Sequence, residues 1–92
     1  MKRPEVTDES LLEAINQATI AIGRRIEQKG RGAFVSSHEA LGVIAEEYHE
    51  LIDAVKNNDP MDVANESLDV AVGCIFTVAS MIQKDKDMKS GS

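Results

Sequence analysis

Two short interruptions divide this sequence into three segments with helical periodicity. GRG at residues 30–32 and NNDP at residues 57–60 combine glycine, asparagine and proline, which end helices and form turns. In the first segment the apolar positions that recur at helical spacing are Ile15, Ala18, Ile22 and Ile26. The sequence has no run of alternating apolar and polar residues of the kind that marks a strand. These features predict an all-α chain of three helices.

Capping residues set the expected bounds of the first two helices. We expect the first helix at residues 8–29, capped by its own first residue or by Thr7. The second helix begins at a capping box formed by Ser36 and Glu39, whose side chains accept hydrogen bonds from backbone amides at the start of the helix. It should end near Lys56, where turn-forming residues follow.

The third helix has an equally clear start. Asp59 can cap it, with Pro60 at its first position, and its apolar pattern continues to about residue 84. The short connections predict that neighbouring helices are antiparallel. Because the end of the chain lacks apolar periodicity, we expect one helical domain at residues 1–84 and a disordered tail at residues 85–92.

Composition and charge exclude several classes of function. The net charge is −6, which argues against binding to nucleic-acid polymers or anionic membranes, since both need a basic surface. Cys74 is the only cysteine, so no intramolecular disulfide can form, and we expect it to be a buried small apolar residue. The N-terminus lacks the apolar core of a signal peptide, and the charge-free run at residues 70–82 is too short to span a bilayer. We therefore expect a soluble, cytoplasmic protein.

The second helix concentrates carboxylates beside an apolar face. In helical projection Glu46 and Glu50 belong to an acidic stripe, and Glu47 lies at its border. The expected apolar face consists of Leu41, Ile44, Tyr48, Leu51, Ile52 and Val55. Like charges three or four residues apart destabilise a helix by roughly 0.2–0.5 kcal/mol per pair. A solvated face and a metal site are both compatible with this pattern.

The third helix favours the metal site. Residues 68–82 are apolar almost all round, which predicts a helix buried on most sides. Glu66, Asp69 and Gly73 nevertheless lie on one line of this helix, where a carboxylate would be partly buried and would need a compensating partner. Residues 57–83 contain no lysine or arginine. A divalent cation is therefore the natural partner of these carboxylates.

Two neighbouring helices thus each offer a pair of acids three residues apart. The pairs are Glu47 with Glu50 and Glu66 with Asp69. Facing helices with inward carboxylates can hold hard metal ions, and ligands that are all oxygen favour Mg²⁺ or Mn²⁺. Two such ions close together would suit phosphoryl chemistry.

The motif EExxE (Glu46, Glu47 and Glu50), followed by ExxD (Glu66 to Asp69), resembles the MazG-like nucleotide pyrophosphohydrolases of the all-α NTP pyrophosphatase superfamily. The resemblance covers the second and third predicted helices. It implies Mg²⁺-dependent hydrolysis of (deoxy)nucleoside triphosphates to monophosphates and pyrophosphate, with Mn²⁺ as a possible substitute ion. It also implies that Glu47, Glu50, Glu66 and Asp69 are metal ligands. Glu46 would be an added ligand or would orient the attacking water, so that Glu46, Glu47 and Glu50 form the expected catalytic set.

The resemblance and the apolar third helix together imply a homo-oligomer, a dimer or a tetramer. A homodimer built around the third helices would have a four-helix-bundle-like core. Many relatives carry a further helix after the ExxD helix, which this sequence lacks, so their phosphate-gripping groups cannot be transferred. The candidates here, by charge alone, are Arg24, Arg25, Lys29 and Arg31. The simpler interpretation, which we prefer at this stage, is that basic residues favour the C-terminal end of a helix.

Three interpretations follow from the sequence. The chain is a nucleotide pyrophosphohydrolase of nucleotide-pool housekeeping, a catalytically silent MazG-like dimerisation or regulatory module, or an acidic bundle without a ligand. The line formed by Glu66, Asp69 and Gly73 argues against the third. We leave His49 out of the site because hard metals prefer oxygen, and the preferred base and sugar stay open.

Overall fold

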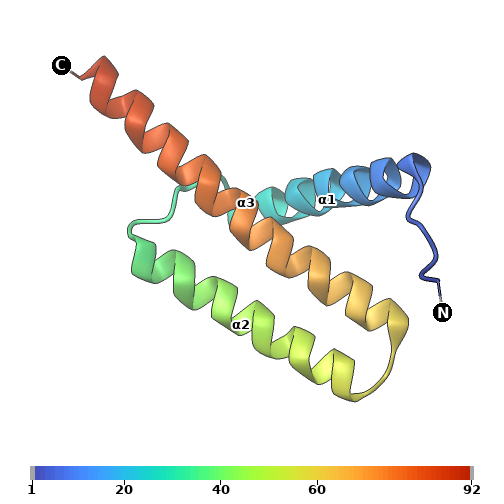
Figure 1. Cartoon of the computed structure of the whole chain (residues 1–92). Helices are drawn as coiled ribbons and strands as arrows, with labels where there is room; N and C mark the ends of the chain where they lie inside the picture. The colour runs from blue at the N-terminus through green and yellow to red at the C-terminus, as the bar shows by residue number, and fades with distance from the viewer. Residues whose placement is uncertain (1, 92) are drawn as a thin grey trace.

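The computed structural model describes residues 2–91 and contains three helices (Figure 1). They are α1 (Asp8–Lys29), α2 (Ser37–Lys56) and α3 (Pro60–Ser90). Residues 2–91 include no strand, so the all-α prediction is confirmed. Met1 and Ser92, the outer ends of the expected domain and tail, lie outside the described residues.

Side-chain caps begin the helices where the sequence predicts them. Thr7 and Ser36 each accept a hydrogen bond, at 3.2 Å, from the backbone amide three residues ahead. Asp59 accepts hydrogen bonds at 3.0 and 3.3 Å from two amides in the first turn of α3. The carboxylate of Glu39 reaches back to the amide of Val35 at 3.2 Å, one residue before the cap, so the capping box forms in a slightly shifted version.

The predicted disordered tail is largely helical, which corrects our expectation. We placed the end of the third helix near residue 84, but α3 continues through most of the tail. Local pairs four residues apart stabilise this extension, because Lys89 forms an ion pair with Asp85 at 2.8 Å and the Gln83 amide donates a hydrogen bond to Asp87 at 3.0 Å. Helical structure here therefore needs no apolar face.

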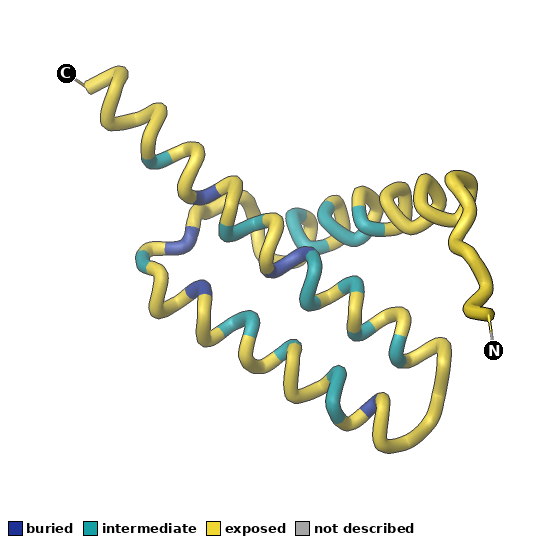
Figure 2. The backbone as a smooth tube through the Cα atoms, viewed as in Figure 1, coloured by how far each residue is buried: buried dark blue, intermediate teal, exposed yellow. Residues whose placement is uncertain are grey.

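α2 and α3 lie side by side and run in opposite directions, as the short connection between them predicts (Figure 1). A side-chain Cβ built at Gly73 would lie 3.4 Å from Cγ1 of Ile44, so the glycine permits this close approach of the two helices. α1 packs on α3 rather than on α2. Its N-terminal half extends away from the other helices and is exposed (Figure 2).

The connection between α1 and α2 is anchored to the middle of α3. The backbone amide of Phe34 donates a hydrogen bond to the buried Ser80 Oγ at 3.1 Å. The Phe34 ring meets the Phe76 ring edge to face, with centroids 5.3 Å apart. Lys84 Nζ donates to the carbonyl of Val35 at 3.0 Å. These contacts fix the C-terminal end of α1 relative to α3.

The single chain buries little apolar surface. Among residues 2–91 the buried apolar side chains are Phe34, Ala40, Ala54 and Val72. The expected apolar face of α2 is only partly covered, since Leu41, Tyr48 and Val55 are more than half exposed. Tyr48, which we expected in the core, is therefore outside it in one chain. The reason is that α3 covers a neighbouring arc of α2 that includes Val43 and Glu47.

The apolar residues 68–82 of α3, which we expected to be buried on most sides with the help of a second chain, are only partly covered within one chain. Ile75, Val78 and Ile82 are exposed on one side of α3, and Cys74, expected to be buried, is exposed as well. α2 and α1 cover only part of the helix circumference. The single chain thus leaves large apolar side chains of α2 and α3 exposed to solvent.

The same surface gives α3 the length and composition of a helix that could cross a membrane. One 18-residue window of α3 has a mean hydropathy of 1.3, and 17% of that window is buried in the chain. This differs from the expectation drawn from the charge-free run alone. A core helix whose partner is a second protein chain has the same composition.

Candidate metal centre

Four carboxylates from α2 and α3 converge at the interface of the two helices. Glu47 and Glu50 come from α2, and Glu66 and Asp69 come from α3. One carboxylate oxygen from each lies within 4.8 Å of the others. The antiparallel packing brings the two pairs together, because residues three apart lie on the same face of a helix. The structure therefore assembles the four predicted ligands into one cluster.

Two of these carboxylates are half-buried and incompletely hydrogen-bonded. Glu47 and Glu66 each have a buried Oε2 atom with no hydrogen-bond partner, whereas Glu50 and Asp69 are exposed. A buried polar atom without a partner destabilises the fold. Among residues 2–91, none of the four carboxylates forms an ion pair with a lysine, arginine or histidine. The cluster thus offers carboxylate oxygens, the ligands that hard divalent cations prefer, and within residues 2–91 has no positive charge paired with it.

Burial, and after it the crowding of negative charge, raises the pKa of both half-buried carboxyl groups. Burial raises the pKa of Glu47, and the neighbouring carboxylates of Glu50 and Asp69 raise it further. Burial also raises the pKa of Glu66, with additional contributions from Glu50, Asp69 and Asp62. Each raised pKa means that the ionised form of the carboxyl group is disfavoured at that position. A bound cation would reverse this effect.

The other acidic and imidazole side chains near the motif lie outside the cluster. Glu46, which we expected to be an added ligand or to orient water, is exposed on α2 and is not among the four converging groups. His49, Asp53 and Asp62 are also outside it. The cluster therefore consists of the four carboxylates that we expected to be ligands, and Glu46 lies outside it.

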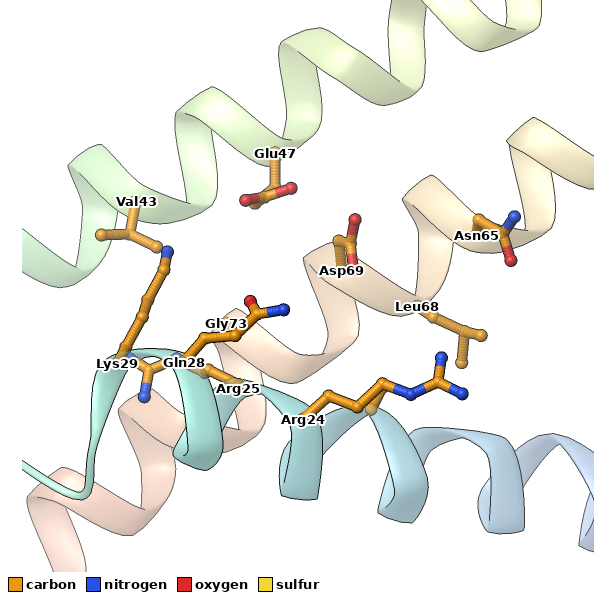
Figure 3. A pocket seen from close by; sticks show the side chains of 11 residues that line it. Arg24, Arg25, Gln28, Lys29, Val43, Glu47, Asn65, Leu68, Asp69 and Gly73 are labelled. Carbon is orange, nitrogen blue, oxygen red and sulfur yellow. The ribbon is translucent and has the colours of Figure 1, made fainter.

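A pocket of about 460 Å³ adjoins the cluster. It is lined by Ala21, Arg24, Arg25, Gln28, Lys29, Val43, Glu47, Asn65, Leu68, Asp69 and Gly73. Figure 3 shows Glu47 and Asp69 pointing toward each other from α2 and α3, while Gln28 and Lys29 extend from α1. Its size is in the usual range of small-molecule sites, roughly 300–1,000 Å³.

Three of the four basic candidates lie on this pocket. Arg24, Arg25 and Lys29 line it, whereas Arg31 lines a separate cavity of about 180 Å³. The guanidinium of Arg25 lies 3.7 Å from the ring centroid of Phe76, a cation–π contact, and its Nη1 atom is buried without a hydrogen-bond partner. These cations come from α1 and Glu47 comes from α2, so their meeting at one pocket is a feature of the tertiary structure.

Two amide side chains in the pocket were not selected from the sequence. Gln28 is four residues after Arg24, and Asn65 is four residues before Asp69, so each shares a helix face with a residue that we had considered. That spacing could have indicated them once the packing of α1 on α3 was known.

Comparison with known proteins adds no assignment: no protein-family model, curated protein or solved structure matches the chain significantly.

Proposed function

We propose that the chain is a Mg²⁺-dependent nucleotide pyrophosphohydrolase that converts (deoxy)nucleoside triphosphates to monophosphates and pyrophosphate. The observation that carries this proposal is the convergence of Glu47, Glu50, Glu66 and Asp69, two of them with buried, unpartnered oxygens, beside a pocket of suitable size. The resemblance of the EExxE and ExxD motifs to the MazG-like enzymes supports the same activity.

The proposed mechanism assigns a role to each carboxylate. Glu47, Glu50, Glu66 and Asp69 would hold Mg²⁺, or Mn²⁺ in its place, with the unpartnered oxygens of Glu47 and Glu66 as ligand atoms. When bound, the metal neutralises phosphate charge and lowers the pKa of a water molecule. Glu46, which precedes Glu47 in the sequence and is exposed on α2, would orient the attacking water, so that Glu46, Glu47 and Glu50 form the proposed catalytic set.

We also propose that two chains form a homodimer in the cytoplasm. The exposed apolar surfaces of α2 and α3 would meet those of the second copy and complete a four-helix-bundle-like core. A protein partner fits better than lipid, because the N-terminal half of α3 carries Asp62, Glu66 and Asp69, which are costly within a bilayer.

The proposed activity is tested by measuring pyrophosphate release from a panel of canonical and modified (deoxy)nucleoside triphosphates, with Mg²⁺ and with EDTA. We expect metal-dependent release that Glu50→Gln abolishes and that Asp53→Asn, a neutralised exposed carboxylate outside the cluster, retains. Full turnover in Glu50→Gln would refute the ligand assignment. No release from any nucleotide by folded, Mg²⁺-binding protein would instead favour the silent dimerisation or regulatory module.

A further inference from the structure

The pocket separates positive from negative charge. Arg24, Arg25 and Lys29 of α1 line it together with Glu47 and Asp69, yet within residues 2–91 none of the three basic side chains forms an ion pair or donates a hydrogen bond. Charged groups that served only to hold α1 in place would be expected to pair across the interface. Here both kinds of charge line one pocket of about 460 Å³ without pairing.

The interaction with the helix dipole does not explain the positions of all three basic residues. The favourable interaction of a basic residue with the helix dipole is confined to the last turn. Lys29 is in the last turn of α1, but Arg24 and Arg25 precede it by at least one turn. The preference that we derived from the sequence therefore applies to Lys29 alone. The cation–π contact with Phe76 accounts for the position of Arg25 but leaves its Nη1 donor without a partner, and within residues 2–91 no carboxylate pairs with Arg24.

The cationic wall of the pocket is held in position. Arg25 stacks on Phe76 at 3.7 Å, and the segment after α1 is anchored by the hydrogen bond from Phe34 to Ser80. The Nη1 atom of Arg25 is buried without a hydrogen-bond partner, so this donor is unsatisfied within the described chain. The neighbouring Arg24 and Lys29 side chains are exposed.

We propose that Arg24, Arg25 and Lys29 form a polyphosphate-binding wall, which grips the phosphate chain of a ligand whose metal is held on the opposite side of the pocket. Guanidinium and ammonium groups are the side chains best suited to phosphate oxygens. The ligand class is a chain of at least two linked phosphates, because one end must reach the acidic cluster and the other must reach α1. This inference rests on the proposed function for the metal, and it assigns the phosphate grip to the first helix.

The test is equilibrium binding of inorganic tripolyphosphate, measured by titration calorimetry with Mg²⁺ and with EDTA. Arg24→Gln and Lys29→Gln should each weaken binding roughly tenfold in Mg²⁺, the effect of losing one charge-assisted hydrogen bond. Lys56→Gln is the matched control, because Lys56 is also a basic residue in the last turn of a helix but lies outside the pocket. We substitute positions 24 and 29 rather than 25, because Arg25 also packs on Phe76 and its substitution would remove that contact.

The outcomes separate this inference from the enzyme assignment. Equal affinity of wild type, Arg24→Gln and Lys29→Gln would overturn the polyphosphate-binding wall whether or not nucleotides are hydrolysed, and so would an absence of binding by folded wild-type protein. Weakened binding in these two variants alone would support it. The same result without pyrophosphate release from any nucleotide would leave the wall standing and refute the hydrolase.

Discussion

Neutralising one carboxylate of the cluster should have opposite effects on stability with and without metal. In EDTA, Glu47→Gln removes a half-buried negative charge that faces Glu50, Glu66 and Asp69, so the free energy of unfolding should rise. In excess Mg²⁺, the wild type gains stability by binding the ion in its folded state, and the variant loses a ligand and gains less. The order of the two melting temperatures should therefore reverse.

The distance within the cluster sets the size of the effect. Two unit charges 4.8 Å apart repel by about 1 kcal/mol in bulk water and by about 3.5 kcal/mol at an effective dielectric constant of about 20. Because Glu50 and Asp69 are exposed to solvent, screening keeps the effect near the lower limit, and we expect a gain of about 1–2 kcal/mol. For a domain of this size that corresponds to a rise in melting temperature of about 5 °C or more.

The assay is thermal unfolding followed by circular dichroism at one fixed protomer concentration, in EDTA and in Mg²⁺. Asp53→Asn is the control, since it removes an exposed carboxylate of the same helix outside the cluster and should change stability by only a few tenths of a kcal/mol, roughly equally in both buffers. The electrostatic reasoning fails if Glu47→Gln destabilises the metal-free protein, or if Mg²⁺ stabilises wild type and variant equally.

Three further predictions follow from the same structure. Because the pKa of Glu66 is raised in the folded state, the stability that its protonated form contributes is fully present below the ordinary pKa of 4.5 and is lost as pH rises through the raised value. In EDTA, Glu66→Gln should therefore be more stable than wild type at neutral pH, and this advantage should vanish at low pH. A pH-independent difference in melting temperature would contradict this. Val78→Asp should convert a dimer to a monomer in light scattering, because it places a charge in the proposed interface. Val6→Asp, at a valine that is also more than half exposed but lies outside the helices, should not do so, and a dimeric Val78→Asp protein would exclude that interface. Asp59→Ala should destabilise the chain by about 1 kcal/mol in denaturant unfolding, since it removes both cap hydrogen bonds of α3, and no change would show that this cap is dispensable.

The helices could be predicted because their signals are local. Thr7, Ser36 and Asp59 mark the helix starts by their own side chains, and each does so in the structure. The end of α3 could not be predicted from apolar periodicity, because ion pairing between Asp85 and Lys89 supports helix without it. Tyr48 is more than half exposed in one chain, since a helical projection gives the apolar face of α2 but not the part of it that α3 covers.

The acidic cluster could be predicted because it needs only two helices in antiparallel contact and two pairs of acids at a spacing of three. Glu47 illustrates the limit of that projection, since it was placed at the border of the acidic stripe and is one of the two half-buried members of the cluster. The cationic side of the pocket could not be predicted, because it depends on how α1 crosses α3. Arg24 and Arg31 are both basic residues near the end of α1, and only the tertiary structure separates them into different cavities.

The most direct test of the metal centre is a crystal structure of the protein grown with Mn²⁺, with anomalous diffraction recorded near the manganese absorption edge. We predict an anomalous peak between α2 and α3, coordinated by oxygens of Glu47, Glu50, Glu66 and Asp69. A well-ordered cluster without such a peak, at a Mn²⁺ concentration that supports tripolyphosphate binding, would contradict the proposal that these four carboxylates hold the metal.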